Sequence, residues 1–148
     1  MNYSEISLHE KLQQGIADAG YVTCTPVQEQ VLSLALDGSD LYVQSQTGTG
    51  KTAAFLVTIF QELLTNPEKQ GCKALIMVPT RELAVQVEDE AKKLGKYTGL
   101  VCESFYGEAE VFVITAEGGV GEIAQGVRSP AENRPLGPWP WRAPLPWC

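Results

Sequence analysis

The first 36 residues carry apolar side chains at helical spacing. In segment 7–20 the apolar residues repeat every four positions, and Gly20 ends the pattern. Ser7 and Glu10 have the spacing of a capping box, in which each side chain bonds the backbone N–H of the other residue. The pattern therefore predicts a helix with Ser7 as its N-cap.

A second helix is predicted over residues 25–36. Thr25 is a favourable N-cap, and Pro26 suits the first helical position because no N–H donor is needed there. Gln28 lies three residues after Thr25 and completes a second capping box. The segment "DGSD" that follows predicts a turn.

Three short apolar runs predict strands, and two longer patterns between them predict helices. The strands are expected at 41–45, 73–78 and 100–106, and 73–78 has the continuous apolar character of a strand buried on both faces. Segment 51–64 predicts a helix that is apolar nearly all round, and 79–98 predicts a turn followed by a helix with a polar face. This alternation predicts an α/β fold with a parallel sheet and flanking helices.

Composition changes abruptly after Gly107. Most of the nine prolines and all three tryptophans lie after residue 129. Proline interrupts helices and central strands, so this Pro/Trp-rich tail is predicted to be irregular, extended or disordered, although 110–116 predicts one further strand. We therefore divide the chain into 1–107 and an unrelated tail, 108–148, of the kind that a frameshift, a truncation or an alternative transcript would give.

The sequence "QTGTGKT" at residues 46–52 has the pattern of a phosphate-binding loop, with Ser45 where the general pattern has its first glycine. The two glycines let the backbone wrap so that successive N–H groups point at phosphate oxygens, and the following helix adds partial positive charge. Lys51 is predicted to neutralise the β and γ phosphates, and Thr52 to ligate Mg²⁺ through its hydroxyl. The alternative is a glycine-rich turn without a ligand, which the spacing of the Lys-Thr pair disfavours.

Together with this loop, two further segments resemble motifs of the DEAD-box RNA helicases. Residues 20–28, "GYVTCTPVQ", are similar to the Q motif of that family, 46–52 to its motif I, and 78–83, "VPTREL", to its motif Ia. Tyr3 stands where the upstream aromatic residue of the family is usually phenylalanine. The order and spacing of these motifs extend the resemblance over residues 1–107.

The resemblance implies an incomplete RecA-like P-loop NTPase domain that binds ATP, Mg²⁺ and RNA. In the family the Q motif recognises adenine; the Gln28 amide offers a donor and an acceptor for the base, and the Tyr21 ring can pack on it. Motif Ia touches the RNA backbone there, and Arg81 in a first helical turn suits a phosphate, with a solvated arginine as the alternative.

These roles carry over onto a defined set of residues. The implied nucleotide-binding residues are Tyr21, Thr25, Gln28, Gln46, Thr47, Gly48, Thr49, Gly50, Lys51 and Thr52. Lys51 and Thr52 are also the implied catalytic residues. The implied RNA-binding residues are Pro79, Thr80, Arg81 and Glu82.

The Asp-Glu-Ala-Asp motif that names the family is absent from the sequence, as are the Ser-Ala-Thr motif and the second domain with its arginine fingers. In the family its acidic side chains support Mg²⁺ and position the attacking water. The run Asp89-Glu90-Ala91-Lys92 falls within a predicted helix, so we interpret it as solvated surface. Glu117 follows the strand predicted at 110–116; a carboxylate near the metal is the alternative there, which is disfavoured because carboxylates at strand ends are common without catalysis.

The resemblance thus implies an ATP-binding fragment of an RNA helicase, whose parent couples ATP hydrolysis to duplex unwinding, without turnover of its own. Two alternatives stay open. One is a non-catalytic protein that holds nucleotide or a helicase partner, with the tail as an interaction segment. The other is a different P-loop enzyme, such as a small kinase, which the Q motif and motif Ia disfavour.

Charge and composition limit the partners and the cellular compartment that the sequence predicts. The net charge of −7 predicts that any RNA contact is local. The chain has no apolar run near the roughly 18 residues of a membrane span and no signal-peptide profile at its start. Four cysteines too far apart for a metal site predict free thiols in the cytoplasm. His9, the only histidine, is expected to be exposed rather than catalytic.

Overall fold

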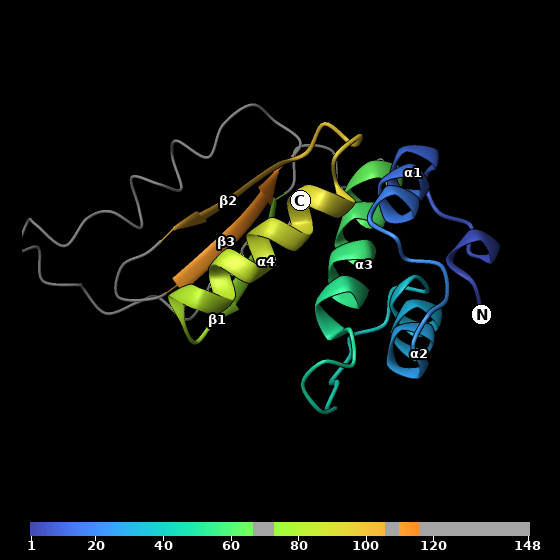
Figure 1. The fold of residues 1–148 in the computed structure, drawn as a ribbon, viewed down its shortest axis with the longest axis horizontal. Helices are drawn as coiled ribbons and strands as arrows, with labels where there is room; N and C mark the ends of the chain where they lie inside the picture. Colours follow the sequence, from blue (N-terminus) through green and yellow to red (C-terminus); the bar gives the residue numbers. More distant parts are fainter. Residues whose placement is uncertain (67–72, 106–109, 116–148) are drawn as a thin grey trace, which may run out of the picture.

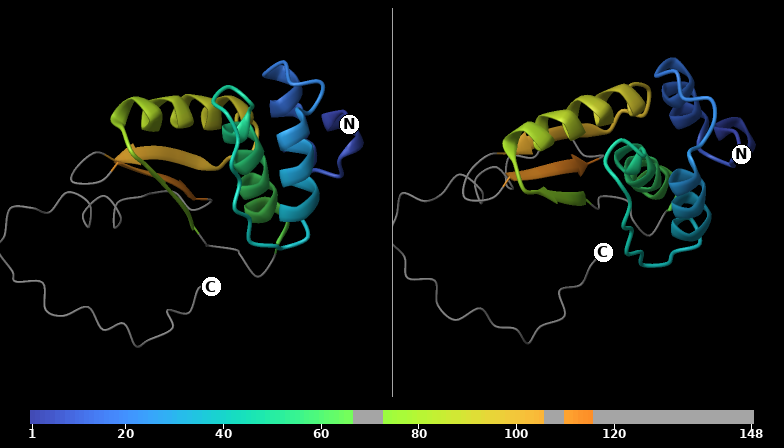
Figure 2. Two further views of the ribbon diagram at one scale, coloured as in Figure 1. Left: turned by 90° about the horizontal axis from the view of Figure 1, so that it is seen from below. Right: turned by 60° about the horizontal axis from the view of Figure 1, so that its bottom comes forward.

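The computed structural model describes residues 1–66, 73–105 and 110–115 (Figure 1). In chain order its elements are the 3-10 helix η1 (Tyr3–Glu5), α1 (Glu10–Asp18), α2 (Pro26–Ala35), α3 (Lys51–Thr65), β1 (Lys73–Val78), α4 (Arg81–Leu94), β2 (Val101–Phe105) and β3 (Glu110–Thr115). Figure 2 shows the sheet as a layer beneath α4, with α3 beside α4 and with α1 and α2 beyond α3. None of the described helices combines the length and the apolar character needed to cross a membrane.

The first helix begins later than the sequence predicts. His9 rather than Ser7 is the N-cap of α1, and its Nδ1 accepts a hydrogen bond from the backbone N–H of Lys11 at 3.3 Å. The Ser7 carbonyl oxygen accepts from Nε2 of Gln61 in α3 at 3.4 Å, and Oε1 of Gln61 accepts from the His9 backbone N–H at 2.8 Å. The predicted capping box of Ser7 and Glu10 is therefore wrong, because the chain before α1 is bound to α3 instead.

The predicted start of α2 is confirmed. Thr25 Oγ1 accepts from the backbone N–H of Gln28 at 3.3 Å, Gln28 Oε1 accepts from the backbone N–H of Thr25 at 2.8 Å, and Pro26 is the first helical residue. Thr80 caps α4 in a similar way, since its Oγ1 accepts from the Leu83 backbone N–H at 3.2 Å. Both helices thus begin where a local side-chain acceptor satisfies a backbone donor.

The sheet has the strand order β1-β3-β2, and β3 is antiparallel to both of its neighbours. β1 and β2 consequently run in the same direction, as a parallel sheet requires, but they do not pair with each other. The prediction of a parallel sheet is therefore wrong for the strand pairing that the structure describes. Only residues 106–109 separate β2 from β3, and a connection that short joins antiparallel strands, because a parallel crossover needs a dozen residues or more.

The segment for which a further strand was predicted, 110–116, forms β3 at Glu110–Thr115. It lies at the centre of the described sheet, where Ile114 pairs in register with Ala74 of β1 and with Cys102 of β2. Ile114 is fully buried against the helices. This strand therefore joins β1 and β2 into one sheet.

Residues 41–45, predicted as the strand before the phosphate loop, form no strand. A strand is stable only when its backbone groups pair with a neighbour, and the described sheet does not reach this segment. Tyr42 is 92% exposed as a result.

α4 covers only one face of the sheet. Side chains of Ala74 and Ile76 face the core, whereas Leu75 and Met77, which alternate with them along β1, are 60% and 75% exposed. The prediction that β1 is buried on both faces is therefore wrong. Apolar side chains from the four α-helices and from Ile114 form one core, and the largest fully buried ones include Phe60, Leu12, Ile16, Leu32, Leu56, Leu94 and Val87.

We expect Gly15→Ala to destabilise the protein by about 1–3 kcal/mol, although alanine favours an isolated helix over glycine by about 1 kcal/mol. A Cβ at Gly15 in α1 would lie 2.0 Å from the backbone carbonyl oxygen of Leu94, so α1 and α4 would have to separate. Urea unfolding measures the change. Gln14→Ala, at an exposed position of the same helix, is the matched control and is expected to stay within about 0.5 kcal/mol of the wild type. Equal stability of Gly15→Ala and the control would contradict the close packing of the two helices.

Candidate functional site

The phosphate loop leads directly into α3. Gly48 and Gly50 have φ values of 81° and 85°, in the left-handed region that favours glycine, and Gly50 is the N-cap of α3. Lys51 and Thr52 are the first two residues of the helix. The loop therefore presents backbone donors and the positive end of the helix dipole at one place, which suits an anion.

Lys51 lies folded back over the loop. Its Nζ donates to the carbonyl oxygens of Ser45 and Gln46, both at 2.6 Å, and to the Ser45 hydroxyl at 3.1 Å. Ser45 Oγ also lies 2.8 Å from Thr49 Oγ1, and Thr49 Oγ1 donates to the Gln46 carbonyl oxygen at 2.9 Å. The polar side chains of the loop are thus bonded to one another.

Two side chains at the start of α2 are hydrogen-bonded to the backbone of the loop. Thr25 Oγ1 donates to the carbonyl oxygen of Thr49 at 2.8 Å, and Gln28 Nε2 donates to the carbonyl oxygen of Gly50 at 3.2 Å. Gln28 is only 1% exposed, and the rest of its amide takes part in the capping box described above. The segment that caps α2 therefore also positions the end of the loop.

A side chain at position 50 would displace the Gln28 amide from the loop. A Cβ at Gly50 would lie 2.3 Å from Gln28 Nε2, and the positive φ would strain any other residue as well. Gly48 also has a positive φ but has open space around it. Two separate constraints thus select glycine at position 50, and one selects it at position 48.

An aromatic pair lies near the N-terminus. The rings of Tyr3 and Tyr21 pack edge to face with centroids 5.9 Å apart, and Tyr3 is buried. The Tyr21 hydroxyl donates to the Glu90 carboxylate of α4. Burial raises the pKa of the Tyr21 phenol to about 12, and the hydrogen bond to Glu90 and its negative charge add to the rise.

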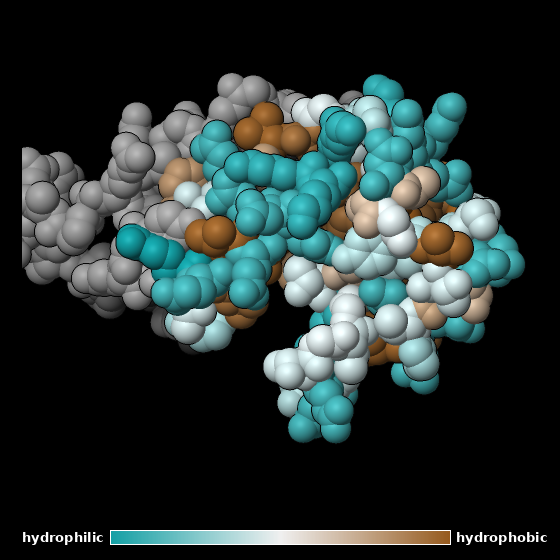
Figure 3. All heavy atoms as spheres, viewed as in Figure 1, coloured by the Kyte–Doolittle hydropathy of each residue, from teal (hydrophilic) through white to brown (hydrophobic). Residues whose placement is uncertain are grey.

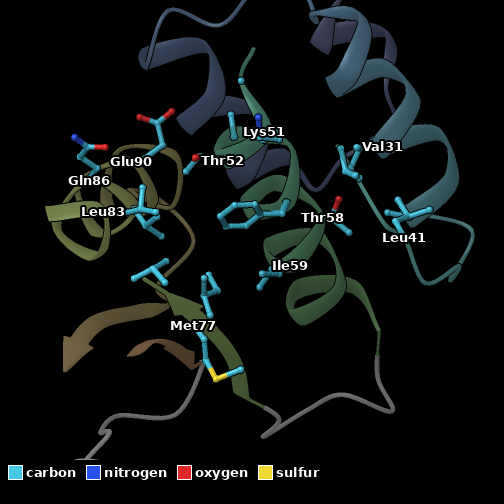
Figure 4. Close-up of a pocket in the computed structure, with 18 of the residues that line it drawn as sticks. Val31, Leu41, Lys51, Thr52, Thr58, Ile59, Met77, Leu83, Gln86 and Glu90 are labelled. Atoms are coloured by element: carbon cyan, nitrogen blue, oxygen red, sulfur yellow. The ribbon is translucent and has the colours of Figure 1, made fainter. Parts of the chain in front are cut away.

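A cleft of about 980 Å³ extends from the loop across α3 to β1 and α4. Figure 4 shows Lys51 and Thr52 at the start of α3, with Leu83 and Glu90 of α4 on another side of the cleft. Its walls are largely apolar and include Phe55, Ile59, Ile76, Met77 and Val43. Figure 3 shows the molecule hollowed between α4 and the loop that projects before α3. The candidate site thus opens into a cavity large enough for a nucleotide.

A protein-family model described as DEAD/DEAH box helicase matches residues 25–116, which is more than half of the chain. The chain belongs to the DEAD/DEAH box helicase family. The match includes the loop, the start of α4 and β3.

Curated relatives agree with this membership. The chain is 44% identical over 109 residues to the ATP-dependent RNA helicase RhlB of Idiomarina loihiensis, an alignment that covers 71% of this chain and 26% of the relative. It is also 44% identical over 110 residues to RhlB of Yersinia pestis, with the same coverage. The chain thus spans about a quarter of the length of the curated relatives it matches.

Solved structures of DEAD-box proteins resemble the fold. The RNA helicase Prp28 from Chaetomium thermophilum, bound to ADP, superposes with a TM-score of 0.64 at 37% identity, over 72% of this chain and 27% of that one. A DEAD box protein from Methanococcus jannaschii gives a TM-score of 0.57 at 36% identity, over 64% and 25% of the two chains. These likenesses confirm the predicted RecA-like α/β class, in a partial form.

The ten residues proposed for nucleotide binding in this DEAD/DEAH box helicase lie in three places, and two of them, Gln46 and Thr49, are bonded to each other within the loop. Tyr21, Thr47, Gly48, Gly50, Lys51 and Thr52 line the cleft. Thr25 and Gln28 instead lie behind the loop and bond its carbonyl oxygens, as described above. The Gln28 amide would have to turn toward the cleft to meet a base, so its predicted role in reading adenine stays a prediction.

The predicted RNA-binding residues lie where β1 leads into α4. Pro79 follows β1 and lines the cleft, and Thr80 caps α4. Arg81 and Glu82 form the exposed first turn of that helix. The stretch is therefore accessible at a helix N-terminus, and contact with RNA stays a prediction.

The residues of the loop fit a nucleotide with Mg²⁺. The cradle at Gly50 leaves no room for a side chain, and the loop offers backbone donors and the Lys51 ammonium to phosphate oxygens. Thr52 offers a hydroxyl to the ion. No cluster of three or more His, Cys, Asp or Glu side chains suited to a metal occurs among the described residues. Mg²⁺ in proteins commonly keeps water ligands and binds substrate phosphates beside one or two protein oxygens.

Glu90 is a cleft residue that the sequence interpretation missed. The run of residues 89–92 lies within α4 as predicted, but only Asp89 and Lys92 are well exposed, whereas Glu90 is half-buried and lines the cleft. Val87, one turn earlier on α4, is buried, and this helical spacing was the available signal for the orientation of Glu90. Glu117 lies outside the described residues.

We expect Gln28→Ala to destabilise the protein by about 1–3 kcal/mol, because it leaves the Thr25 N–H without its side-chain acceptor and removes one of two donors to the Gly50 carbonyl oxygen, the other being the Ala54 N–H. Gln30→Ala, at an exposed position of the same helix, is the matched control and is expected to have an effect below about 0.5 kcal/mol. The free energy of unfolding in urea distinguishes them. Equal effects of the two substitutions would contradict the supporting role of Gln28.

The raised pKa of Tyr21 predicts a pH dependence of stability. Because the folded state holds this phenol protonated to about pH 12, the stabilisation is fully present below the unfolded pKa near 10 and is lost as the pH rises through 12. We expect the free energy of unfolding to fall more steeply between these pH values in the wild type than in Tyr21→Phe. Parallel curves for the two proteins would show that Tyr21 has no raised pKa.

Proposed function

We propose that this chain is the ATP-binding part of a DEAD-box RNA helicase and that it binds ATP with Mg²⁺ without turnover of its own. The observation that carries the proposal is the pair of hydrogen bonds from Thr25 and Gln28 to the carbonyl oxygens of Thr49 and Gly50. These bonds connect the segment that resembles an adenine-reading motif to a loop shaped for phosphates. A glycine-rich turn without a ligand would not require such a connection.

Each part of the loop has a defined task in this proposal. The backbone N–H groups of residues 46–52 and the N-terminus of α3 bind the phosphates. Lys51 releases the carbonyl oxygens of the loop and pairs with the β and γ phosphates, and Thr52 holds Mg²⁺ through its hydroxyl. Mg²⁺ supplies charge neutralisation at the phosphates when it is bound. Tyr21 lines the cleft, and the Gln28 amide would turn from the loop toward the cleft to meet adenine.

RNA is the proposed partner of residues 79–82, at the start of α4. Residues 79–82 are exposed around the N-terminus of α4, where a phosphate of the RNA backbone would be bound without base recognition. The net charge of −7 supports a contact confined to such a place. Relatives named ATP-dependent RNA helicases support RNA as the partner.

The acidic residues of the cleft support the proposal of binding without turnover. A phosphoryl transfer site needs a carboxylate or a comparable group to position the attacking water. Among the described residues, Asp40 and Glu90 are the acidic side chains that line the cleft, and Glu90 already accepts the hydrogen bond of Tyr21. The relatives with helicase names are about four times longer than the matched region.

A second candidate function is that of a non-catalytic protein that binds a partner through the cleft. The apolar wall favours it, since Leu41, Val43 and Met77 line the cleft and are 37%, 39% and 75% exposed. Under this function nucleotide binding would regulate the partner rather than drive unwinding.

We expect the wild-type chain to bind MgATP and Lys51→Ala to bind it about 10- to 100-fold more weakly, because a charge-assisted hydrogen bond is lost. Isothermal titration calorimetry measures the affinity. Lys93→Ala removes an exposed lysine of α4 and is the matched control, with wild-type affinity expected. Failure of the wild type to bind MgATP would refute the proposed function.

A parallel assay of phosphate release, with and without RNA, tests turnover. We expect no hydrolysis above that of Lys51→Ala under either condition. RNA-stimulated hydrolysis that Lys51→Ala abolishes would show that the chain is a complete ATPase, contrary to the proposal.

A further inference from the structure

Ser45 occupies a central position in the hydrogen bonds of the phosphate loop. It stands just before the segment 46–52, and both its carbonyl oxygen and its hydroxyl accept from the Lys51 ammonium. The Gln46 carbonyl oxygen is the third acceptor of this ammonium. An ammonium has three donors and no acceptor, so all of its hydrogens are used within the loop.

The donors and acceptors of the loop can be assigned in only one way. Thr49 Oγ1 donates its single hydrogen to the Gln46 carbonyl oxygen, which can only accept. The hydrogen between Ser45 Oγ and Thr49 Oγ1 must therefore come from Ser45. Ser45 then accepts from Lys51 through its remaining lone pairs. The hydrogen bonds run from Lys51 to Ser45, from Ser45 to Thr49 and from Thr49 to Gln46, whose carbonyl oxygen also accepts from Lys51.

We propose that Ser45 is a positioning residue that holds Lys51 on the loop in the nucleotide-free state, and that its hydroxyl thereby lowers the affinity of the site for nucleotide phosphates. The inference rests on the proposed function and concerns the regulation of the same site. A phosphate can draw Lys51 away only by breaking its bond to the Ser45 hydroxyl. A contact made in the free state alone opposes ligand binding by its own strength.

The bond from Lys51 to Ser45 is the part of this arrangement that a side-chain substitution can remove. The other two acceptors of Lys51 are backbone carbonyl oxygens and stay in place in any variant. Ser45→Ala removes the hydroxyl, leaves one ammonium hydrogen for a phosphate oxygen, and retains the bond from Thr49 to Gln46. Ser45→Thr retains a hydroxyl at the same position.

The test compares the affinity for MgADP of the wild type, Ser45→Ala and Ser45→Thr by isothermal titration calorimetry. We expect Ser45→Ala to bind MgADP roughly three- to tenfold more tightly than the wild type, as the loss of one hydrogen bond from the free state predicts. Ser45→Thr is expected to restore the wild-type affinity. Tighter binding by Ser45→Ala but not by Ser45→Thr supports the proposal, because general damage to the loop would weaken binding.

A second measurement follows Lys51 without nucleotide. Acetylation of lysine amines in the free protein, quantified by mass spectrometry, is expected to modify Lys51 faster in Ser45→Ala than in the wild type, with the exposed Lys93 as the internal reference. Unchanged reactivity of Lys51 would show that Ser45 does not act through this ammonium, and the proposal would be wrong.

The outcomes also separate this inference from the proposed function. If the wild type binds MgADP and Ser45→Ala binds it equally or more weakly, the inference alone is overturned. If neither protein binds MgADP, the proposed function is overturned and the inference with it.

Discussion

The hydrogen bond from the Gln28 amide to the Gly50 carbonyl oxygen joins the two segments on which the candidate site depends. The same buried amide closes the capping box with Thr25 and so fixes the start of α2. No strand precedes the loop in the part of the chain that the structure describes, so the loop takes its position from α2 and α3 instead. Because a buried amide is costly to leave unpaired, the start of the helix and the end of the loop hold each other in place.

The described sheet lies under α4 and does not extend beneath α3, and the cleft opens beside α3. Its three strands lie under α4, and α3 packs against helices rather than against the sheet (Figure 2). The cleft beside α3 has largely apolar walls, and side chains that line it, such as Met77, are exposed. The candidate site therefore adjoins an apolar surface.

The sequence predicts best what neighbouring residues determine. The cap at Thr25 and the glycines of the phosphate loop follow from local bonds and local φ values, and the structure has them as predicted. The predictions that are wrong concern long-range partners: segment 41–45 has strand composition but no strand beside it, and Ser7 bonds Gln61 instead of capping a helix. Helical spacing from Val87 indicates that Glu90 faces inward, but which elements meet α4 at that position follows only from the structure.

Binding a nucleotide and cleaving it make different demands on a chain. Binding needs a few consecutive residues, a helix N-terminus and one support; segment 46–52 leads into α3 and is bonded by Gln28, and the proposed function assigns binding to this stretch. Cleavage needs acidic groups carried to the terminal phosphate by other elements of a complete sheet. The family resemblance is strong where the first demand is met, and the chain spans only about a quarter of its helicase relatives. Under the proposed function, a chain of this kind would bind nucleotide, and hydrolysis would require acidic groups from further elements of the sheet.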